Sequence, residues 1–214
     1  MRIKICGVTN LDDAEAAVGL GAWAIGLNHH FESPRLVAPD VAAEIGARLK
    51  RRCEVAGVFV NASLNEIERA AEAEQLTLLQ LHGDEGPAFC AEAARRTGCK
   101  VIKALRVRSA ADVRAAKTYR TDYHLLDAYR PGRAGGTGES FDWELTAGHS
   151  GGIPLILAGG LQPRNVADAI AAARPFAVDV ASGVEAEPGR KDPELLREFF
   201  DAARSAAPAG STAT

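Results

Sequence analysis

The stretch Ile3-Lys4-Ile5-Cys6, followed at once by Gly7, is a short apolar run that stops at a turn. Similar runs recur along the 214 residues, and they start every 20 to 32 residues. That spacing is typical of one strand followed by one helix. The eight runs are Arg2–Cys6, Ala22–Asn28, Glu54–Val60, Leu76–Leu81, Lys100–Leu105, Asp122–Asp127, Pro154–Ala158 and Phe176–Val180.

The segments between these runs have helical spacing and helix-start signals. Val41, Ile45 and Leu49 recur on one face of a predicted helix. Asn10 precedes an acidic first turn, and Ser63 precedes Glu66 at the spacing of a capping box. The strands are continuously apolar, as expected when helices cover a parallel sheet.

Eight strand-helix units favour a closed barrel over an open doubly wound sheet. An open sheet usually has fewer strands, and no glycine-rich dinucleotide fingerprint follows the first strand here. We therefore predict an α/β fold, a single-domain (β/α)8 TIM barrel over residues 1–205. Residues 206–214 are small and polar, and we expect them to form a disordered tail.

Composition excludes several classes of protein. The net charge is -3 with no basic stripe, which argues against nucleic-acid binding. No apolar run approaches the roughly 18 residues of a membrane helix, and no signal peptide is recognisable. The four cysteines lack CxxC spacing, which indicates reduced thiols in a cytoplasmic protein without a zinc site.

Polar and glycine residues collect where the predicted strands end, and chemistry in such barrels takes place at that end. Cys6 ends the first strand, where a thiolate can act as a base; the alternative is a small buried hydrophobe. Asp127 ends the sixth strand, as a general acid or base or else as a simple cap. Residues on strands one and six would reach opposite sides of a small substrate, which suits an isomerase that moves protons.

Glycine-rich turns follow the last two strands, at Gly159-Gly160 and at Ser182-Gly183. Barrels bind phosphate at these two loops, because glycine lets backbone amides approach the ligand closely. The alternative is that these are ordinary turn glycines. A third glycine-rich run, Gly132–Gly138, is too long for a tight turn and reads as a mobile loop over the site.

Charged residues supply further expectations. Arg35 offers a planar fork of donors for a carboxylate, unless it is a solvated surface residue. Lys4 shares the inward face with Cys6, and we predict that it pairs with Asp179 on the neighbouring eighth strand. Gln80 and His82 share a face of strand four. His29 and His30 diverge in an extended chain and lack a third ligand, so we expect no metal there.

A set of motifs occurs in order along nearly all of the chain. They are Lys4-Ile5-Cys6-Gly7-Val8-Thr9, Ser33-Pro34-Arg35, Leu79-Gln80-Leu81-His82-Gly83, Leu126-Asp127, Gly135-Gly136-Thr137-Gly138, Phe141-Asp142-Trp143, Leu157-Ala158-Gly159-Gly160-Leu161, Asp179-Val180-Ala181-Ser182-Gly183-Val184-Glu185 and Lys191-Asp192. In these motifs the chain resembles the phosphoribosylanthranilate isomerase family of tryptophan biosynthesis. The loop Asn28-His29-His30-Phe31-Glu32 departs from the family pattern, which is more apolar or aromatic and often contains a lysine.

The resemblance implies an Amadori rearrangement of N-(5-phosphoribosyl)anthranilate to 1-(2-carboxyphenylamino)-1-deoxyribulose 5-phosphate. It implies that Asp127 is the general acid, that Cys6 is the general base and that Arg35 holds the anthranilate carboxylate. The remaining expected substrate-binding residues are His82, Gly136, Gly159, Gly160, Ser182 and Gly183. The substrate is a small phosphorylated aminosugar, no cofactor or metal is needed, and the protein would be a monomer or a homodimer.

Two other functions remain open on the sequence. A Schiff-base aldolase on the same fold would use Lys103 of the fifth strand. A non-catalytic phosphate-binding barrel would keep the glycine turns but would need neither Cys6 nor Asp127. The related histidine-pathway isomerase is a similar barrel with paired aspartates, one of which ends strand one. This chain has Cys6 at that position, which argues against an enzyme that accepts both substrates.

Overall fold

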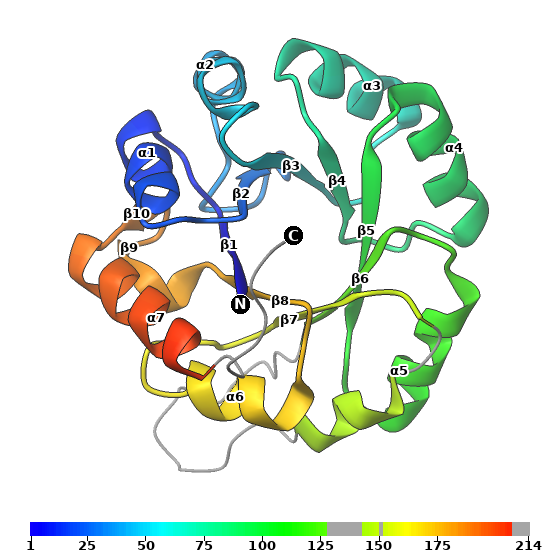
Figure 1. Cartoon of the computed structure of the whole chain (residues 1–214). Helices are drawn as coiled ribbons and strands as arrows, with labels where there is room; N and C mark the ends of the chain where they lie inside the picture. The colour runs from blue at the N-terminus through cyan, green and yellow to red at the C-terminus, as the bar shows by residue number, and fades with distance from the viewer. Residues whose placement is uncertain (128–142, 150–151, 207–214) are drawn as a thin grey trace.

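The computed structural model describes residues 1–127, 143–149 and 152–206. Eight parallel strands hydrogen-bond in chain order, and the last pairs with the first, so the sheet closes into a barrel (Figure 1). They are β1 (Arg2–Cys6), β2 (Ala24–Asn28), β3 (Glu54–Phe59), β4 (Leu78–Leu81), β5 (Lys100–Arg106), β6 (Tyr123–Asp127), β7 (Leu155–Ala158) and β8 (Ala177–Val180). The predicted barrel is confirmed, and the predicted strand limits differ from these by at most two residues.

Helices lie around the outside of the barrel (Figure 1). They are α1 (Leu11–Gly19), α2 (Pro39–Leu49), α3 (Leu64–Ala73), α4 (Pro87–Thr97), α5 (Ala110–Ala115), α6 (Val166–Ala173) and α7 (Pro193–Ser205). Within the described residues, three short 3-10 helices accompany them: η1 (Ala116–Thr118), η2 (Trp143–Gly148) and η3 (Ser182–Val184). A two-stranded hairpin, β9 (Glu185–Glu187) and β10 (Arg190–Lys191), follows η3. No helix in the described ranges is long and apolar enough to cross a lipid bilayer.

The predicted helix starts are confirmed by their caps. The side chain of Asn10 accepts a hydrogen bond from the amide of Asp13 at 2.8 Å. Ser63 and Glu66 bond reciprocally as a capping box at the start of α3. Such caps satisfy amides that have no partner within the helix, and they set where each helix begins.

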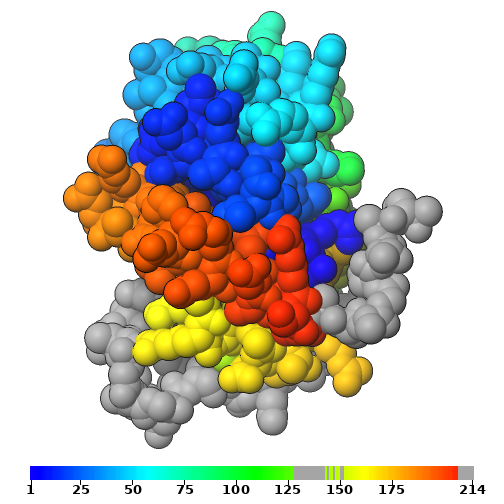
Figure 2. Space-filling view, turned by 60° about the vertical axis from the view of Figure 1, so that its left-hand side comes forward, coloured from blue at the N-terminus to red at the C-terminus, as the bar shows by residue number. Residues whose placement is uncertain are grey.

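The last helix covers the seam where the sheet closes. Figures 1 and 2 show α7 lying between α1 and α6, over the edge where β8 pairs with β1. It buries one apolar face, made of Leu196, Phe199, Phe200 and Ala203. Side chains on β1 that point away from the barrel axis, such as Ile3 and Ile5, belong to the same apolar layer as α7.

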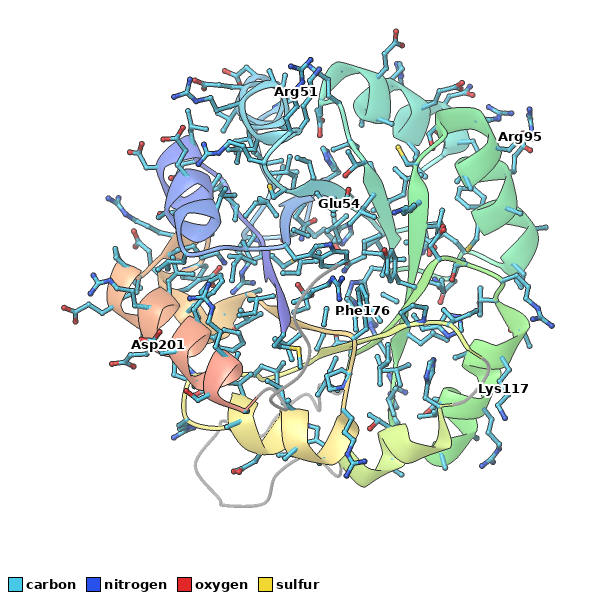
Figure 3. All side chains as sticks on the ribbon, in the orientation of Figure 1. Arg51, Glu54, Arg95, Lys117, Phe176 and Asp201 are labelled. Carbon is cyan, nitrogen blue, oxygen red and sulfur yellow. The ribbon has the colours of Figure 1, made fainter. Side chains whose placement is uncertain are left out.

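The inside of the barrel is filled by a separate apolar cluster. Its fully buried members include Ala24, Ala56, Leu78, Ile102, Leu125, Ile156 and Ala177. Below them Trp23, Tyr123 and Phe176 stack edge-on or tilted, with ring centroids 5.4–5.6 Å apart. In Figure 3 Phe176 lies near the middle of the ring, whereas Arg95, Lys117 and Asp201 project outward. Apolar side chains therefore close the amino-terminal end, and the polar strand ends lie at the other.

Candidate active site

Cys6 ends β1 with its side chain directed into the barrel, on the same face as Lys4. The residue is 9% exposed. Two residues below, the Nζ atom of Lys4 donates to Oδ1 of Asp179 on β8 at 2.9 Å. The predicted pairing is confirmed, and it follows from the register that sets the two residues side by side. Burial raises the pKa of the Cys6 thiol, and the Lys4 ammonium opposes that rise.

Asp127 and His82 meet at the same end of the barrel. Asp127 is the last residue of β6, and His82 directly follows β4. Oδ2 of Asp127 lies 3.4 Å from Nε2 of His82. The other ring nitrogen of His82 lies 2.9 Å from Nε2 of Gln80, as expected for residues on one face of a strand. The side chains of His82 and Asp127 are each 21% exposed, so both are accessible to a small ligand.

Arg35 is held at the barrel mouth and is not a solvated surface residue. Its aliphatic stem crosses Gly7, where the left-handed backbone (φ +70°) and the absence of Cβ allow the approach. Its Nε and Nη2 atoms donate to the carboxylate of Glu185 at 2.8 and 2.6 Å. Among the described residues, no other acceptor occupies the second pair of guanidinium donors, on Nη1 and Nη2. This pair is therefore available to the carboxylate of a ligand.

Lys191 on β10 ties the ends of two strands together. Its Nζ atom donates to the backbone oxygens of Cys6 at 2.7 Å and of Ala181 at 3.2 Å, and to Glu185 at 2.8 Å. Burial lowers the pKa of Lys191. Burial alone would raise the pKa of Glu185, but its hydrogen bonds to Arg35 and Lys191 outweigh that effect, so the pKa of Glu185 is lowered. Sequence reasoning assigned no role to Lys191 or Glu185, although both lie in the matching motifs.

The two glycine turns lie against each other. Gly159 and Gly160 have φ of +95° and +66°, which favours glycine. A Cβ atom on Gly183 would lie 1.9 Å from the backbone oxygen of Leu161, so only glycine allows these loops to touch. Ser182 opens η3 at the same place. Gly136, the remaining predicted binding residue, lies outside the described residues, as do Gly132–Gly138 and 207–214 of the predicted tail.

Lys103 does not lie in this cluster. Its neighbours on β5, Ile102 and Ala104, belong to the apolar cluster inside the barrel, so Lys103 points outward. Its Nζ atom donates to the backbone oxygens of Leu81 and Gly83 and to Glu85, at 3.1, 2.7 and 2.8 Å. An ammonium with three acceptors on the outer face is unsuited to form a Schiff base with a ligand at the barrel mouth.

The sequence matches the family model described as N-(5'phosphoribosyl)anthranilate (PRA) isomerase over residues 3–202. The chain belongs to the PRA isomerase family. It is 47% identical over 206 residues to the N-(5'-phosphoribosyl)anthranilate isomerase of Citrifermentans bemidjiense, which covers 96% of this chain and 98% of that protein. The crystal structure of the Thermotoga maritima phosphoribosyl anthranilate isomerase has a TM-score of 0.87 at 41% identity, covering 96% and 99% of the two chains.

A further structure of the PRA isomerase family contains a ligand. That enzyme was solved in complex with reduced 1-(o-carboxyphenylamino)-1-deoxyribulose 5-phosphate. It matches this chain with a TM-score of 0.84 at 39% identity, and the match covers 96% of this chain and 99% of that one. A likeness of this extent relates the whole barrel, including the strand ends, to an enzyme that holds a phosphorylated aminosugar.

The loop that departs from the PRA isomerase pattern is accommodated by packing. His29 stacks on Phe59 with ring centroids 4.7 Å apart, and its Nε2 atom lies 3.0 Å from Oε2 of the buried Glu74. His30 turns instead toward Glu32, at 3.6 Å. The two adjacent histidines thus have different neighbours: His29 lies beside Glu74 at the C-terminal end of α3, and His30 lies beside Glu32 in the same loop.

Proposed function

We propose that this chain catalyses the Amadori rearrangement of N-(5-phosphoribosyl)anthranilate to 1-(2-carboxyphenylamino)-1-deoxyribulose 5-phosphate in tryptophan biosynthesis. The observation that carries the proposal is the placement of Cys6 and Asp127 at the ends of β1 and β6, two non-adjacent strands of one barrel. A base and an acid in these places face a small ligand from two sides. The ligand of the related crystal structure is the reduced form of this product, which supports the same substrate here.

The acid step opens the sugar ring. Asp127 gives a proton to the furanose ring oxygen, and the bond between that oxygen and C1 breaks as the nitrogen lone pair forms a protonated imine. His82, 3.4 Å from Asp127, lies close enough to orient the carboxyl group. The imine is an electron sink within the substrate itself, so the proposed chemistry calls for no cofactor or metal.

The base step moves the double bond. The Cys6 thiolate removes the proton from C2, and the electrons of that bond form C1=C2 while the imine nitrogen regains its lone pair. The resulting enolamine gains a proton at C1 and loses the C2 hydroxyl proton, which gives the ketone. Two positioned proton-transfer groups therefore suffice, because the protein holds them and the substrate in place.

Arg35 is proposed to bind the anthranilate carboxylate through the donors that Glu185 leaves available. Replacing Arg35 by glutamine should raise KM about 10- to 150-fold. This factor corresponds to the loss of about 1.5–3 kcal/mol, the usual contribution of a hydrogen bond to a charged group. Glu185 would keep Lys191 as a partner, so the fold should persist. The matched control is Arg48→Gln, which removes an exposed arginine that pairs with Glu15 on the surface. An unchanged KM for Arg35→Gln would show that the carboxylate binds elsewhere.

The backbone amides of Gly159, Gly160, Ser182 and Gly183 are proposed to bind the phosphate. In Gly183→Ala the new Cβ must push the two loops apart, because Leu161 presents a backbone atom that has little freedom. We expect KM for the phosphorylated substrate to rise between about 10- and 100-fold, as a misplacement of about 1 Å predicts. The control is Gly86→Ala, where a Cβ meets nothing within 4 Å. Equal KM values in steady-state assays of the two variants would exclude this phosphate site.

We further propose that residues 1–205 act as one catalytic domain, with 206–214 outside it, in a cytoplasmic enzyme that binds no nucleic acid. A monomer and a homodimer both fit a site whose proposed residues come from one chain; the Thermotoga maritima relative is dimeric and has also been solved as a monomer.

Turnover of N-(5-phosphoribosyl)anthranilate by the purified chain tests the function. We expect the anthranilate fluorescence of the substrate to decrease over time, at a rate proportional to the enzyme concentration. Treatment of the enzyme with a chelator should leave this rate unchanged. Lys103→Met with Glu85→Gln, which removes the buried pair together, should keep this activity. Loss of activity in that folded variant, together with borohydride trapping of sugar on the wild-type chain, would favour the aldolase. No turnover by the wild-type chain would contradict the proposal.

A further inference from the structure

A buried ion pair lies directly beneath Cys6, and the reaction as described makes no use of it. Lys4 is 0% exposed and Asp179 is 7% exposed. A buried pair of this kind contributes little to stability, because removing two charges from water costs about as much as their attraction returns. Most of the rest of the barrel interior is filled by apolar side chains, chiefly alanine, leucine and isoleucine, with an aromatic cluster at the amino-terminal end and one buried amide, Gln80, beside His82. Apolar residues would fill the positions of Lys4 and Asp179 as well, so the charges call for another explanation.

Gly26 on β2 leaves a notch that both Cys6 and Lys4 border. It pairs in register with Cys6, and a Cβ atom there would lie 2.8 Å from the sulfur of Cys6 and 3.0 Å from Nζ of Lys4. Real Cβ atoms essentially never have a contact as short as the first of these. Gly26 has no positive φ, so space and not backbone conformation requires glycine here. Because both atoms border one point, the ammonium and the sulfur are neighbours.

The charged groups around the sulfur leave one net positive charge. The Cys6 thiol interacts electrostatically with three cations and one carboxylate. The cations are Lys4 on β1, Lys191 on β10 and Arg35 after β2, and the carboxylate is Asp179 on β8. Glu185 neutralises one more cation through its bonds to Arg35 and Lys191. Three cations thus face two carboxylates among the described residues, and a thiolate would balance the cluster.

The pKa of the Cys6 thiol is raised overall, and Lys4 limits that rise without abolishing it. Burial is the largest cause of the rise, the charge of Lys4 is the largest influence that opposes it, and Asp179 adds to it. Burial acts to lower the pKa of Lys4, but Asp179 and Cys6 outweigh that effect and the pKa is raised. Lys4 therefore remains an ammonium at the pH where the thiol must lose its proton.

We propose that Lys4 is a positioning residue for the Cys6 base: its ammonium, clamped by Asp179, holds the deprotonated sulfur beside the notch that Gly26 leaves open. The catalytic part of this inference rests on the proposed role of Cys6, while the pairing of charge and sulfur does not. When the sulfur takes a proton from C2, the thiolate charge is lost while the Lys4–Asp179 ion pair stays intact, so the cluster returns to one net positive charge.

The test compares Asp179→Asn with the double variant Lys4→Met/Asp179→Asn, which differ only in the Lys4 side chain. Neither leaves an unpaired buried carboxylate, and circular dichroism verifies that both fold. The rate at which iodoacetamide alkylates Cys6 is measured against pH without substrate, with the modified peptide quantified by mass spectrometry. We expect the double variant to react at least about 10-fold more slowly at pH 7, the effect of one pKa unit. Asp179→Asn should react as fast as the wild type or faster.

Equal pH profiles for the two folded variants would overturn the proposal. The pH profile of kcat/KM should move in the same direction as the alkylation profile. A wild-type chain that does not turn over the substrate would refute the proposed function, whereas the alkylation rates would still decide the pairing of Lys4 and Cys6.

Gly26→Ala gives a second test that leaves every charge in place. Its Cβ must displace the sulfur of Cys6, so we expect kcat to fall about 10- to 100-fold. The control is Gly19→Ala at the end of α1, where a Cβ meets nothing within 4 Å. Full activity in a folded Gly26→Ala variant would show that the notch has no part in seating the sulfur.

Discussion

Replacement of Cys6 by alanine is expected to lower kcat about 10²- to 10⁴-fold, the usual contribution of a general base. The substitution removes one sulfur atom at the end of β1 and leaves the backbone bond from Cys6 to Lys191 intact. The binding groups, Arg35 and the glycine turns, are unchanged, so KM should change little. Steady-state kinetics, followed by anthranilate fluorescence, separate the two parameters.

A second thiol provides the control for this substitution. Cys53 lies in the turn before β3, half-buried, and burial raises its pKa to about 11. Cys53→Ala should therefore leave kcat and KM within about twofold of the wild type, since surface changes away from the site have small effects. Wild-type activity in Cys6→Ala would remove Cys6 from the mechanism.

Asp127→Asn is expected to reduce kcat by a similar factor, about 10²- to 10⁴-fold. Asparagine has the shape of aspartic acid, but it has no acidic proton to give to the ring oxygen. Its side-chain oxygen can still face Nε2 of His82, so the geometry around the site should be retained. The loss should appear in kcat and not in stability, which thermal unfolding of the variant verifies.

The control for Asp127 is an aspartate at the other end of the same strand. Asp122 precedes β6, and its carboxylate accepts a hydrogen bond from the amide of Val101 at 2.8 Å. Asp122→Asn should keep that bond and the activity. If Asp127→Asn were as active as Asp122→Asn, the proton would have to come from another group.

The barrel was predictable because its strands are short, continuously apolar and regularly spaced. Alternation of side chains along β1 placed Lys4 and Cys6 on one face, and closure of the barrel placed Asp179 beside Lys4. Both inferences need only local sequence and one topological rule. The limits of the strands were less accurate because flanking residues such as Ala22 and Leu76 are apolar yet lie outside the ladders.

Contacts between loops were not predictable in the same way. Glu185 and Lys191 read as ordinary charged residues, and only the hairpin of β9 and β10 turns them toward Arg35 and Cys6. From the sequence, Gly26 is only a glycine that destabilises a strand. The strand register shows that it lies beside Cys6. Such roles depend on which residues meet across the barrel, and a single sequence does not contain that information.

In the proposed mechanism Cys6 removes the proton from C2 of the sugar. Substrate that carries deuterium at C2 tests it directly, because the product is a ketone at that carbon and retains no hydrogen there. We expect the wild type to release this deuterium more slowly than hydrogen, and Cys6→Ala to leave it on the substrate at the same enzyme concentration. Release from C2 by Cys6→Ala at the wild-type rate would show that another group removes this proton.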